Sequence, residues 1–425
     1  MTATYLTWAV SALSVLGVIS RPFGWPEAIW AVLGAIVLLG LGAIGFGAIG
    51  INDAWAGVAK GYDVYLFLIG MMLLSELARR EGLFDWLAAL ATQRAKGSPL
   101  RLFVLLYGVG VLVTAFLSND ATAVVLTPAV YAATKAARLK NPMPYLLICA
   151  FIANAASFVL PISNPANLVI FGGGEMLPLS TWLATFALPS LVAIVVTFAM
   201  LYWSQRRAIH AEVMDRQVET PHLSHSAKLA GWGLILTAVV LMVASALGLD
   251  LGLPTFIAGV LTTVLVLALS GQGPAETLKG MSWSVLPLVA GLFVLVEALD
   301  KTGLTVLLAR YLSEAAAADA KAAAMGAGLL VGFLSNLVNN LPAGLVAGAT
   351  VQGAHVGSTV SGAMLIGVDL GPNLSVTGSL ATILWLSALR REGLHMGALE
   401  FLKIGAVVMI PALVLSLLAL VAVTG

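Results

Sequence analysis

Two short stretches place amides and hydroxyls inside otherwise apolar sequence. The first, "FLSNDATAVVLTP", begins at Phe116, and the second, "FLSNLVNNLPAGL", begins at Phe333. Two further stretches have a similar composition, at Pro161–Asn167 and Asp369–Ser379, and their Gly and Pro residues end helices readily. Because Asn, Ser and Thr both donate and accept hydrogen bonds, these four stretches are the candidate binding groups of the chain.

A break in a helix is informative when the surrounding sequence is apolar. Unsatisfied backbone groups in lipid cost several kcal/mol each, so breaks are expected only where they are buried in protein or line a site. Half-helices that begin at the breaks direct partly positive N-termini at such a site. The predicted substrate-binding residues are Asn119, Thr122, Ser163, Asn164, Asn167, Asn339, Asn340, Asn373, Thr377, Ser379 and Thr382. The alternative is that individual residues of this set only cap helices.

The charge of these stretches restricts the substrate. Their ionisable residues are Asp120 and Asp369, and no Lys or Arg lies near them in sequence. A dicarboxylate gains little from two carboxylates without a cation, so a neutral polyol-like solute or a cation fits better. Carboxyl groups within a membrane are candidate proton carriers, and we assign proton coupling to Asp120 and Asp369. The alternative for Asp120 is a structural role as an N-cap.

Composition indicates that membrane helices position these groups. Of the 425 residues, 60% are hydrophobic and 10% charged, with a mean hydropathy of +1.01, whereas soluble proteins have about 25% charged residues. An apolar run of about 20 residues crosses a hydrocarbon core. The first apolar segment lacks a basic leader, so we interpret it as a retained helix. Crossings are expected near 5–20, 27–50, 62–79, 143–172, 180–203, 228–247, 254–270, 282–299, 357–389 and 397–421.

Two regions, 99–138 and 321–352, each hold a pair of short apolar helices around a polar stretch. If each pair re-enters the membrane, its basic flanks share one side, as the positive-inside bias prefers. This topology puts 17 of the 21 Lys and Arg residues inside. It predicts a multi-pass protein of the cell (inner) membrane with both termini extracytoplasmic. Two full crossings per pair preserve the downstream orientation equally well.

The two halves of the chain resemble each other. "SELARREGLFDWL" from Ser75 resembles "VEALDKTGLTVLL" from Val296, which aligns Glu76 with Glu297 and Gly82 with Gly303. Further on, Phe116–Asn119 matches Phe333–Asn336, and "SNPANL" from Ser163 lies opposite "GSLATI" from Gly378. The predicted fold is an all-α polytopic membrane protein, an inverted repeat with two re-entrant hairpins, two broken helices and about 10 full crossings, as in many secondary transporters. Glu76 and Glu297 lie near helix ends and are expected to be interfacial or structural.

The sequence resembles the arsenite efflux permease family of the ion transporter superfamily. The resemblance rests on "GVDLGPNLSVTGSLATILWLSAL" at Gly367–Leu389, "LVNNLP" at Leu337–Pro342 and "NDATAVVLTP" at Asn119–Pro128, and it runs over nearly the whole chain. "ISNPANLV" agrees more loosely with the family pattern. The resemblance implies export of arsenite or antimonite as neutral trihydroxides, driven by proton exchange without a cofactor. It also implies a separate cytoplasmic arsenical-pump ATPase as an occasional partner.

Two further expectations concern the means of recognition and energy supply. Cys149 is the single cysteine, so the chain cannot hold arsenic through three thiolates, and recognition must use hydroxyls and amides. The sequence contains no GxxxxGK[ST] motif, so the chain itself is not expected to hydrolyse ATP.

The superfamily also implies an elevator-like division of the chain. Residues 1–97 and 228–320 would form the scaffold, and 204–227 the cytoplasmic linker. Residues 98–203, with the inner hairpin, and 321–425, with the outer hairpin, would form the moving transport part. The segments 81–96 and 302–318 mix charged and apolar residues and are expected to lie along the interfaces as amphipathic helices.

Other functions stay open at this stage. A sodium/proton antiporter or sodium-coupled anion carrier of the same superfamily would bind Na⁺ through carbonyl and side-chain oxygens at the hairpin tips. A channel would conduct without proton coupling. An intramembrane enzyme is disfavoured because the breaks contain no His cluster, Ser–His arrangement or HExxH motif, and the scattered histidines predict no metal site. No nucleic-acid partner is expected.

Overall fold

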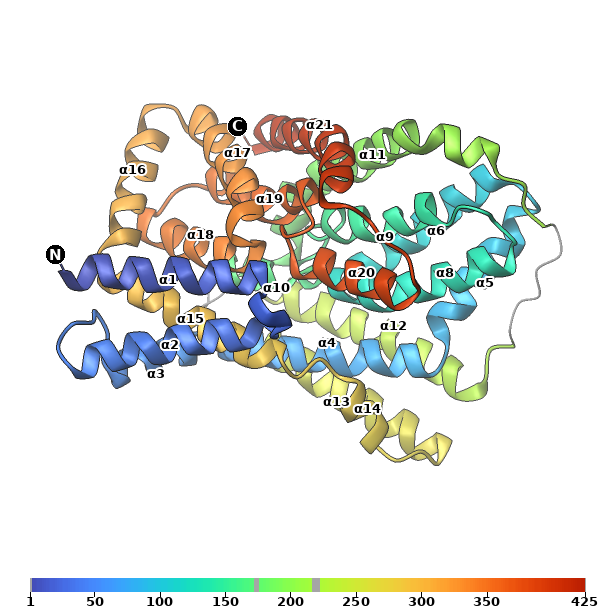
Figure 1. Ribbon diagram of the computed structural model, residues 1–425, viewed down its shortest axis with the longest axis horizontal. Coiled ribbons are helices and arrows are strands. Elements are labelled where there is room, and N and C mark those ends of the chain that lie inside the picture. Colours follow the sequence, from blue (N-terminus) through green and yellow to red (C-terminus); the bar gives the residue numbers. More distant parts are fainter. Residues whose placement is uncertain (1, 172–175, 216–221, 425) are drawn as a thin grey trace.

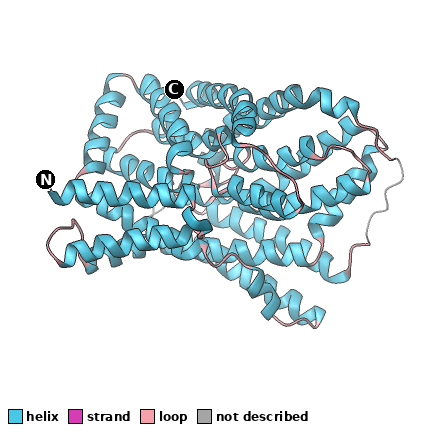
Figure 2. Ribbon diagram, in the orientation of Figure 1, coloured by secondary structure: helices cyan, strands magenta, loops and turns pink. Residues whose placement is uncertain are grey.

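The computed structural model describes residues 2–171, 176–215 and 222–424, and all regular structure in these ranges is helical (Figure 2). Seven described helices are long and apolar enough to cross a membrane: α1 (Thr2–Ser20), α6 (Pro99–Phe116), α11 (Leu179–Ala211), α12 (His225–Ala246), α13 (Gly252–Ser270), α17 (Ala320–Val338) and α21 (Ala398–Thr424). An eighth candidate is α3 (Ile51–Lys60) with α4 (Tyr62–Arg80), which meet at 48°. The shorter helices α2 (Glu27–Ala43) and α9 (Met143–Ala155) are also apolar. The predicted all-α membrane fold is confirmed.

The two halves repeat one order of elements. In the first half, α4 leads to α5 (Leu83–Ala95), α6, α7 (Asn119–Ala121), η2 (Thr122–Leu126), α8 (Thr127–Ala136), α9, η3 (Pro161–Ser163), α10 (Pro165–Phe171) and α11. In the second half, α15 (Val285–Lys301) leads to α16 (Leu304–Ala318), α17, α18 (Asn340–Ala354), α19 (Ser358–Leu370), η4 (Gly371–Leu374), α20 (Leu380–Arg391) and α21. In Figure 1, α4 runs toward α5 at the right and α15 runs toward α16 at the left. Equivalent elements therefore point in opposite directions, which confirms the inverted repeat.

Each half contains a helical hairpin held by a shorter helix. Helices α6 and α8 both pack against α5, and α17 and α18 both pack against α16. The chain enters α5 through Gly82 at φ 73° and α16 through Gly303 at φ 82°. Glycine adopts this left-handed conformation without a steric penalty, so the same sharp turn starts the hairpin in both halves.

The remaining helices join the halves crosswise. Helix α2 packs on α15 and α13 packs on α4, while the short helices α3 and α14 (Ala275–Gly280) also lie against α15 and α4, respectively. These elements run along the bottom of Figure 1, with α17, α21 and α11 along the top. The linker predicted at 204–227 begins inside α11 and ends inside α12. Its residues 216–221 lie outside the described part of the chain, as do residues 1, 172 and 425 at the ends of other predicted segments.

The helices that hold the breaks form the buried centre. Every residue of α9 from Pro144 to Ala155 is buried, as is α19 from Val360 to Leu370. Helices α17 and α19 approach closely because glycines face each other: a Cβ on Gly367 would collide with the carbonyl oxygen of Gly328. Small residues at such a crossing bring two backbones into direct contact. The half-helices also cross between halves, with α10 against α18 and α20 against η2 and α8.

Candidate functional site

The tip of the first hairpin is capped by its own polar side chains. Ser118 Oγ accepts a hydrogen bond from the Ala121 amide at 3.2 Å, and Asn119 Oδ1 accepts one from the Asp120 amide at 2.9 Å. The hydroxyls of Thr122 and Thr114 are 2.7 Å apart. The next residues, η2, form a π-helical turn, a feature that is frequent at functional sites. The N-cap of this short helix is therefore Ser118, and not Asp120, for which a capping role was the alternative.

The tip of the second hairpin uses Asn339 in place of Ser118. Asn339 caps α18 through a hydrogen bond from the Leu341 amide at 3.3 Å, and its Nδ2 donates to the Thr377 carbonyl at 3.1 Å. The Asn340 amide donates to the Gly378 carbonyl at 2.8 Å. Because Ser118 and Asn339 are equivalent caps, Asn119 corresponds to Asn340. The sequence match that paired Asn119 with Asn336 is therefore one helical turn out of register.

The break between α9 and α10 is held by hydrogen bonds to carbonyl groups. Ser163 Oγ donates to the Ala115 carbonyl at 2.8 Å, which fixes the break to the first hairpin. Asn167 Nδ2 lies 3.0–3.2 Å from the carbonyl oxygens of Ser157, Leu160 and Pro161. The donors of Ser163 and Asn167 are thus used within the protein, and these residues shape the break.

Asn164 and Asp369 connect the two halves. Asn164 Nδ2 donates to Asp369 Oδ1 at 2.8 Å, and Asn164 Oδ1 accepts the Ala166 amide at 3.1 Å. Asp369 is fully buried, and its Oδ2 has no hydrogen-bond partner among the described residues. The Ser157 hydroxyl faces this carboxyl group but donates to the Asn154 carbonyl at 2.7 Å. One oxygen of a buried acid is therefore left without a donor, and no described contact supplies a cation to it.

A second polar network surrounds the break after α19. Asn154 Nδ2 donates to Asn373 Oδ1 at 3.0 Å and lies 3.4 Å from Thr382 Oγ1. Asn373 Nδ2 donates to the Phe151 carbonyl at 2.9 Å. Ser379 caps α20, since its Oγ accepts the Thr382 amide at 3.1 Å. This network brings together three of the predicted residues, all fully buried.

Asn154 was not among the predicted binding residues, although the internal repeat places it at the position equivalent to Asp369. Helices α9 and α19 are equivalent, and Asn154 and Asp369 each stand one residue before the end of their helix. Asn336 and Ser375 were also absent from the predicted binding set. Asn336 Nδ2 donates to the carbonyls of Gly332 and Gly371, both at 2.9 Å, and its Oδ1 accepts the Ser375 hydroxyl at 2.9 Å.

Asp120 has different surroundings from Asp369. It is partly exposed to a cavity of about 70 Å³ that lies between the first hairpin tip and α4. The described residues form no hydrogen bond or ion pair with its carboxylate, while its backbone amide donates to Asn119 Oδ1. The charged residues that line this cavity are Asp120 and Glu76. The two predicted proton-coupling groups thus occupy separate places, one enclosed and one open to a cavity.

A protein-family model described as "CitMHS: Citrate transporter" matches residues 15–373, which is most of the chain. The chain belongs to this citrate transporter family. It is a membrane transporter by this relationship, with several membrane-spanning helices.

The chain is also similar to proteins described as arsenical pump membrane proteins. It is 29% identical to the arsenical pump membrane protein of Escherichia coli over 434 residues and 29% identical to that of Yersinia enterocolitica over 436, with 98% of each chain covered in both cases. An uncharacterised transporter of Mycobacterium tuberculosis is 27% identical over 360 residues, or 82% of each chain. The resemblance to arsenite efflux permeases is thereby confirmed.

The fold of this family member also matches a solved structure. The YdaH transporter of Alcanivorax borkumensis, described as having an unusual topology, superposes with a TM-score of 0.57 over 93% of this chain and 96% of that one. The two sequences are 14% identical. This likeness shows a common fold, and the binding chemistry must be argued from the residues described above.

Proposed function

We propose that this protein is a secondary active transporter that exports arsenite and antimonite as neutral trihydroxides in exchange for protons. The observation that carries the proposal is the buried pair of Asn164 and Asp369, which meets at 2.8 Å with no cation in its described contacts. A solute with hydroxyl groups can donate to the unpartnered Asp369 Oδ2 and accept from amide groups.

The charge of the site favours a neutral solute over citrate, the anion after which the family is named. A citrate anion bound at the Asn164–Asp369 pair would bring negative charge next to the Asp369 carboxyl group, and like charges close together in a site are costly. The side-chain amides of Asn119 and Asn340 donate no hydrogen bond to other described residues, so both side-chain amides are free to bind, although the Asn340 backbone amide is bonded to Gly378. The proposed binding set keeps the eleven predicted residues, with Thr122, Ser163 and Asn167 shaping the site through their internal bonds.

The packing also supports an elevator-like motion. The Gly328–Gly367 contact and the crosswise packing of α10 and α20 join both hairpins and both broken helices into one body. We assign this body to the transport part, residues 98–203 and 321–425, and assign residues 1–97 and 228–320 to the scaffold, with 204–227 as the linker. The proposed setting is the inner membrane with both termini outside, and a cytoplasmic arsenical-pump ATPase is the proposed partner.

The test is arsenite uptake into everted vesicles under an imposed proton gradient without sodium. We expect uptake that collapses with an uncoupler and is lost in Asp369→Asn and in Asp120→Asn. The matched control is Asp319→Asn, because Asp319 is an exposed N-cap of α17 and Asn caps a helix equally well.

Other outcomes would replace the proposal by a named rival. Proton movement on addition of Na⁺, with no arsenite uptake, would indicate a sodium/proton antiporter. Sodium-driven citrate uptake would indicate an anion carrier, and unsaturable flux without proton coupling would indicate a channel.

A further inference from the structure

Glu76 of α4 lines the same cavity as Asp120 of the first hairpin tip. The cavity wall also contains the hydroxyl residues Ser75, Ser118 and Ser282. At about 70 Å³ it has room for several water molecules, since about 15 Å³ of such space is enough for one. Two carboxyl groups, one on the scaffold and one on the transport part, therefore face a small cavity that polar groups can hydrate.

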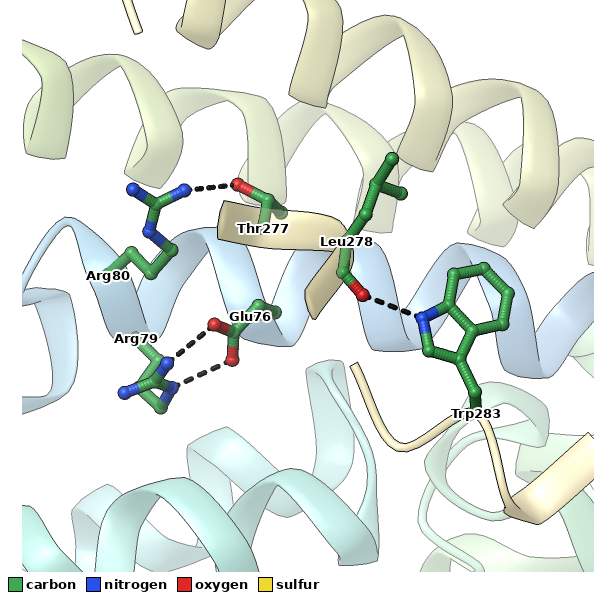
Figure 3. Close-up of polar contacts among 6 residues, drawn as sticks. All are labelled: Glu76, Arg79, Arg80, Thr277, Leu278 and Trp283. Carbon is green, nitrogen blue, oxygen red and sulfur yellow. Dashed lines mark hydrogen bonds and ion pairs between the residues drawn. The ribbon is translucent and has the colours of Figure 1, made fainter. Parts of the chain in front are cut away.

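Glu76 is buried but connected to the surface by Arg79. Arg79 Nε lies 2.7 Å from Glu76 Oε2 and Arg79 Nη2 lies 2.5 Å from Oε1, a two-pronged contact that Figure 3 shows. The Glu76 side chain is 7% exposed and that of Arg79 is 48% exposed. A charge-assisted pair of this geometry is strong and directional. Arg79 thus spans the distance between the buried carboxylate and solvent.

The chain segment that covers Glu76 is fixed in place. Arg80 Nη1 donates to Thr277 Oγ1 at 2.7 Å, and Trp283 Nε1 donates to the Leu278 carbonyl at 2.6 Å (Figure 3). Gly280 lies directly against the Glu76 carboxylate, where a Cβ would collide with it. The cover over Glu76 is therefore a built feature of the scaffold.

The other charged groups near Glu76 lie on α14, on α5 and on further helices that contact α4. Glu276 and Lys279 of α14 pair with each other at 3.6 Å on the surface, and Asp85 of α5 faces Arg79. The packed elements α13 and α10 contain no titratable residue. The remaining charges on elements that touch α4 are His225 and Lys228 of α12, Arg94 of α5, Asp53 and Lys60 of α3, and Glu297, Asp300 and Lys301 of α15.

The inverted repeat supplies an internal comparison. Glu297, the counterpart of Glu76, is equally buried and pairs with Lys60 Nζ at 2.5 Å. Gly57 lies against the Cβ and Cγ of Glu297, whereas Gly280 lies against the carboxylate of Glu76. The tip residue equivalent to Asp120 is Leu341, which cannot hold a proton. A purely structural pair would serve both halves alike, but Glu76 also lines a cavity with a second carboxyl group, that of Asp120.

We propose that this cavity is a proton-transfer site in which Asp120 and Glu76 exchange a proton through water, an inference that rests on the proton exchange proposed above. The O–H bond of protonated Asp120 breaks, the proton passes along the water, and an O–H bond forms on Glu76. Neutral Glu76 releases Arg79 toward solvent. When Arg79 returns, it stabilises the carboxylate again and the proton leaves to the cytoplasm.

The test compares Glu76→Gln with its matched control Glu297→Gln in the full-length protein. Proton-driven arsenite uptake is measured over a range of pH, together with arsenite exchange without a gradient. We expect Glu76→Gln to lower proton-driven uptake by about tenfold or more and to flatten its pH dependence, with exchange retained. Glu297→Gln is expected to keep the wild-type pH dependence, and Glu76→Asp to restore part of the coupling.

Three results would overturn the inference. If Glu76→Gln and Glu297→Gln lose uptake and exchange equally, the Glu76–Arg79 and Glu297–Lys60 pairs both have a structural role. If Glu76→Gln does not fold, failure of Glu76→Asp to restore a pH-dependent rate would have the same meaning. Absence of proton-driven uptake in the wild type would instead refute the proposed function itself, so the two failures are distinguishable.

Discussion

Replacing Gly405 by alanine tests whether the α19–α20 break must keep its observed geometry. Gly405 lies in the buried face of α21, which packs on η4. A Cβ at this position would be 2.5 Å from the Asn373 carbonyl oxygen and 2.6 Å from that of Leu374. Both atoms belong to the backbone, so the clash cannot be relieved by turning a side chain.

The size of the effect follows from these distances. A carbon and a carbonyl oxygen need about 3.3 Å, so η4 must move by about 0.8 Å from α21. The Asn154–Asn373 hydrogen bond is 3.0 Å long, and a displacement of this size directed along it would lengthen it to about 3.8 Å, beyond hydrogen-bond distance. Overpacking of this kind costs about 1–3 kcal/mol of stability. A misplacement of about 1 Å can also lower a rate about 100-fold.

Two quantities are measured for each variant: the initial rate of arsenite uptake and the melting temperature of the purified protein. The control is Gly326→Ala in α17, where a Cβ would meet nothing within 4 Å, and where alanine favours the helix by about 1 kcal/mol. We expect Gly405→Ala to lose most of its uptake and to melt below the control. Equal uptake and melting in the two variants would refute the argument that this close contact positions the site.

Substitutions at three further positions test other parts of the protein. Asn339 has φ 71° and ψ 152°, a region that suits glycine; Asn339→Gly should therefore melt above Asn339→Ala, and the reverse order would contradict this. Cys149→Ala should keep at least about half of arsenite uptake, because a single buried thiol cannot form a three-thiolate site; near-complete loss would implicate the thiol. Asn154→Ala should destabilise the protein by about 1–3 kcal/mol, measured by thermal melting, because Asn373 and Thr382 lose a buried donor.

The membrane fold and the breaks were predictable because their signals are local. Apolar runs of sufficient length identify the helices, and Gly, Pro and polar residues inside them identify the breaks. The sharp turns at Gly82 and Gly303 also follow from local sequence. The caps Asn339 and Ser379 belong to the same class, since N-cap preference depends on one residue and its nearest amides.

Pairings across the chain were not predictable in the same way. The "FLSN" identity suggested that Asn119 and Asn336 are equivalent, but hairpin geometry pairs Asn119 with Asn340. Asn336 instead bonds the carbonyls of two glycines where α17 crosses α19. Glu76 was expected to be interfacial or structural because it lies near a helix end. Its place in one cavity with Asp120 depends on how α4 packs against the hairpin tip, which local sequence does not give. Contacts of this kind are set by tertiary packing.

The crosswise packing of the half-helices has a consequence for the order of folding. Helix α10 of the first half packs against α18 of the second hairpin, and the first hairpin packs against α20, the last described helix but one. Neither half can therefore complete its own break while the other is missing. The four breaks can therefore close around one another only after α20 has been synthesised, and the side-chain amide of Asn164 has no Asp369 carboxylate to bind until 205 residues later in synthesis.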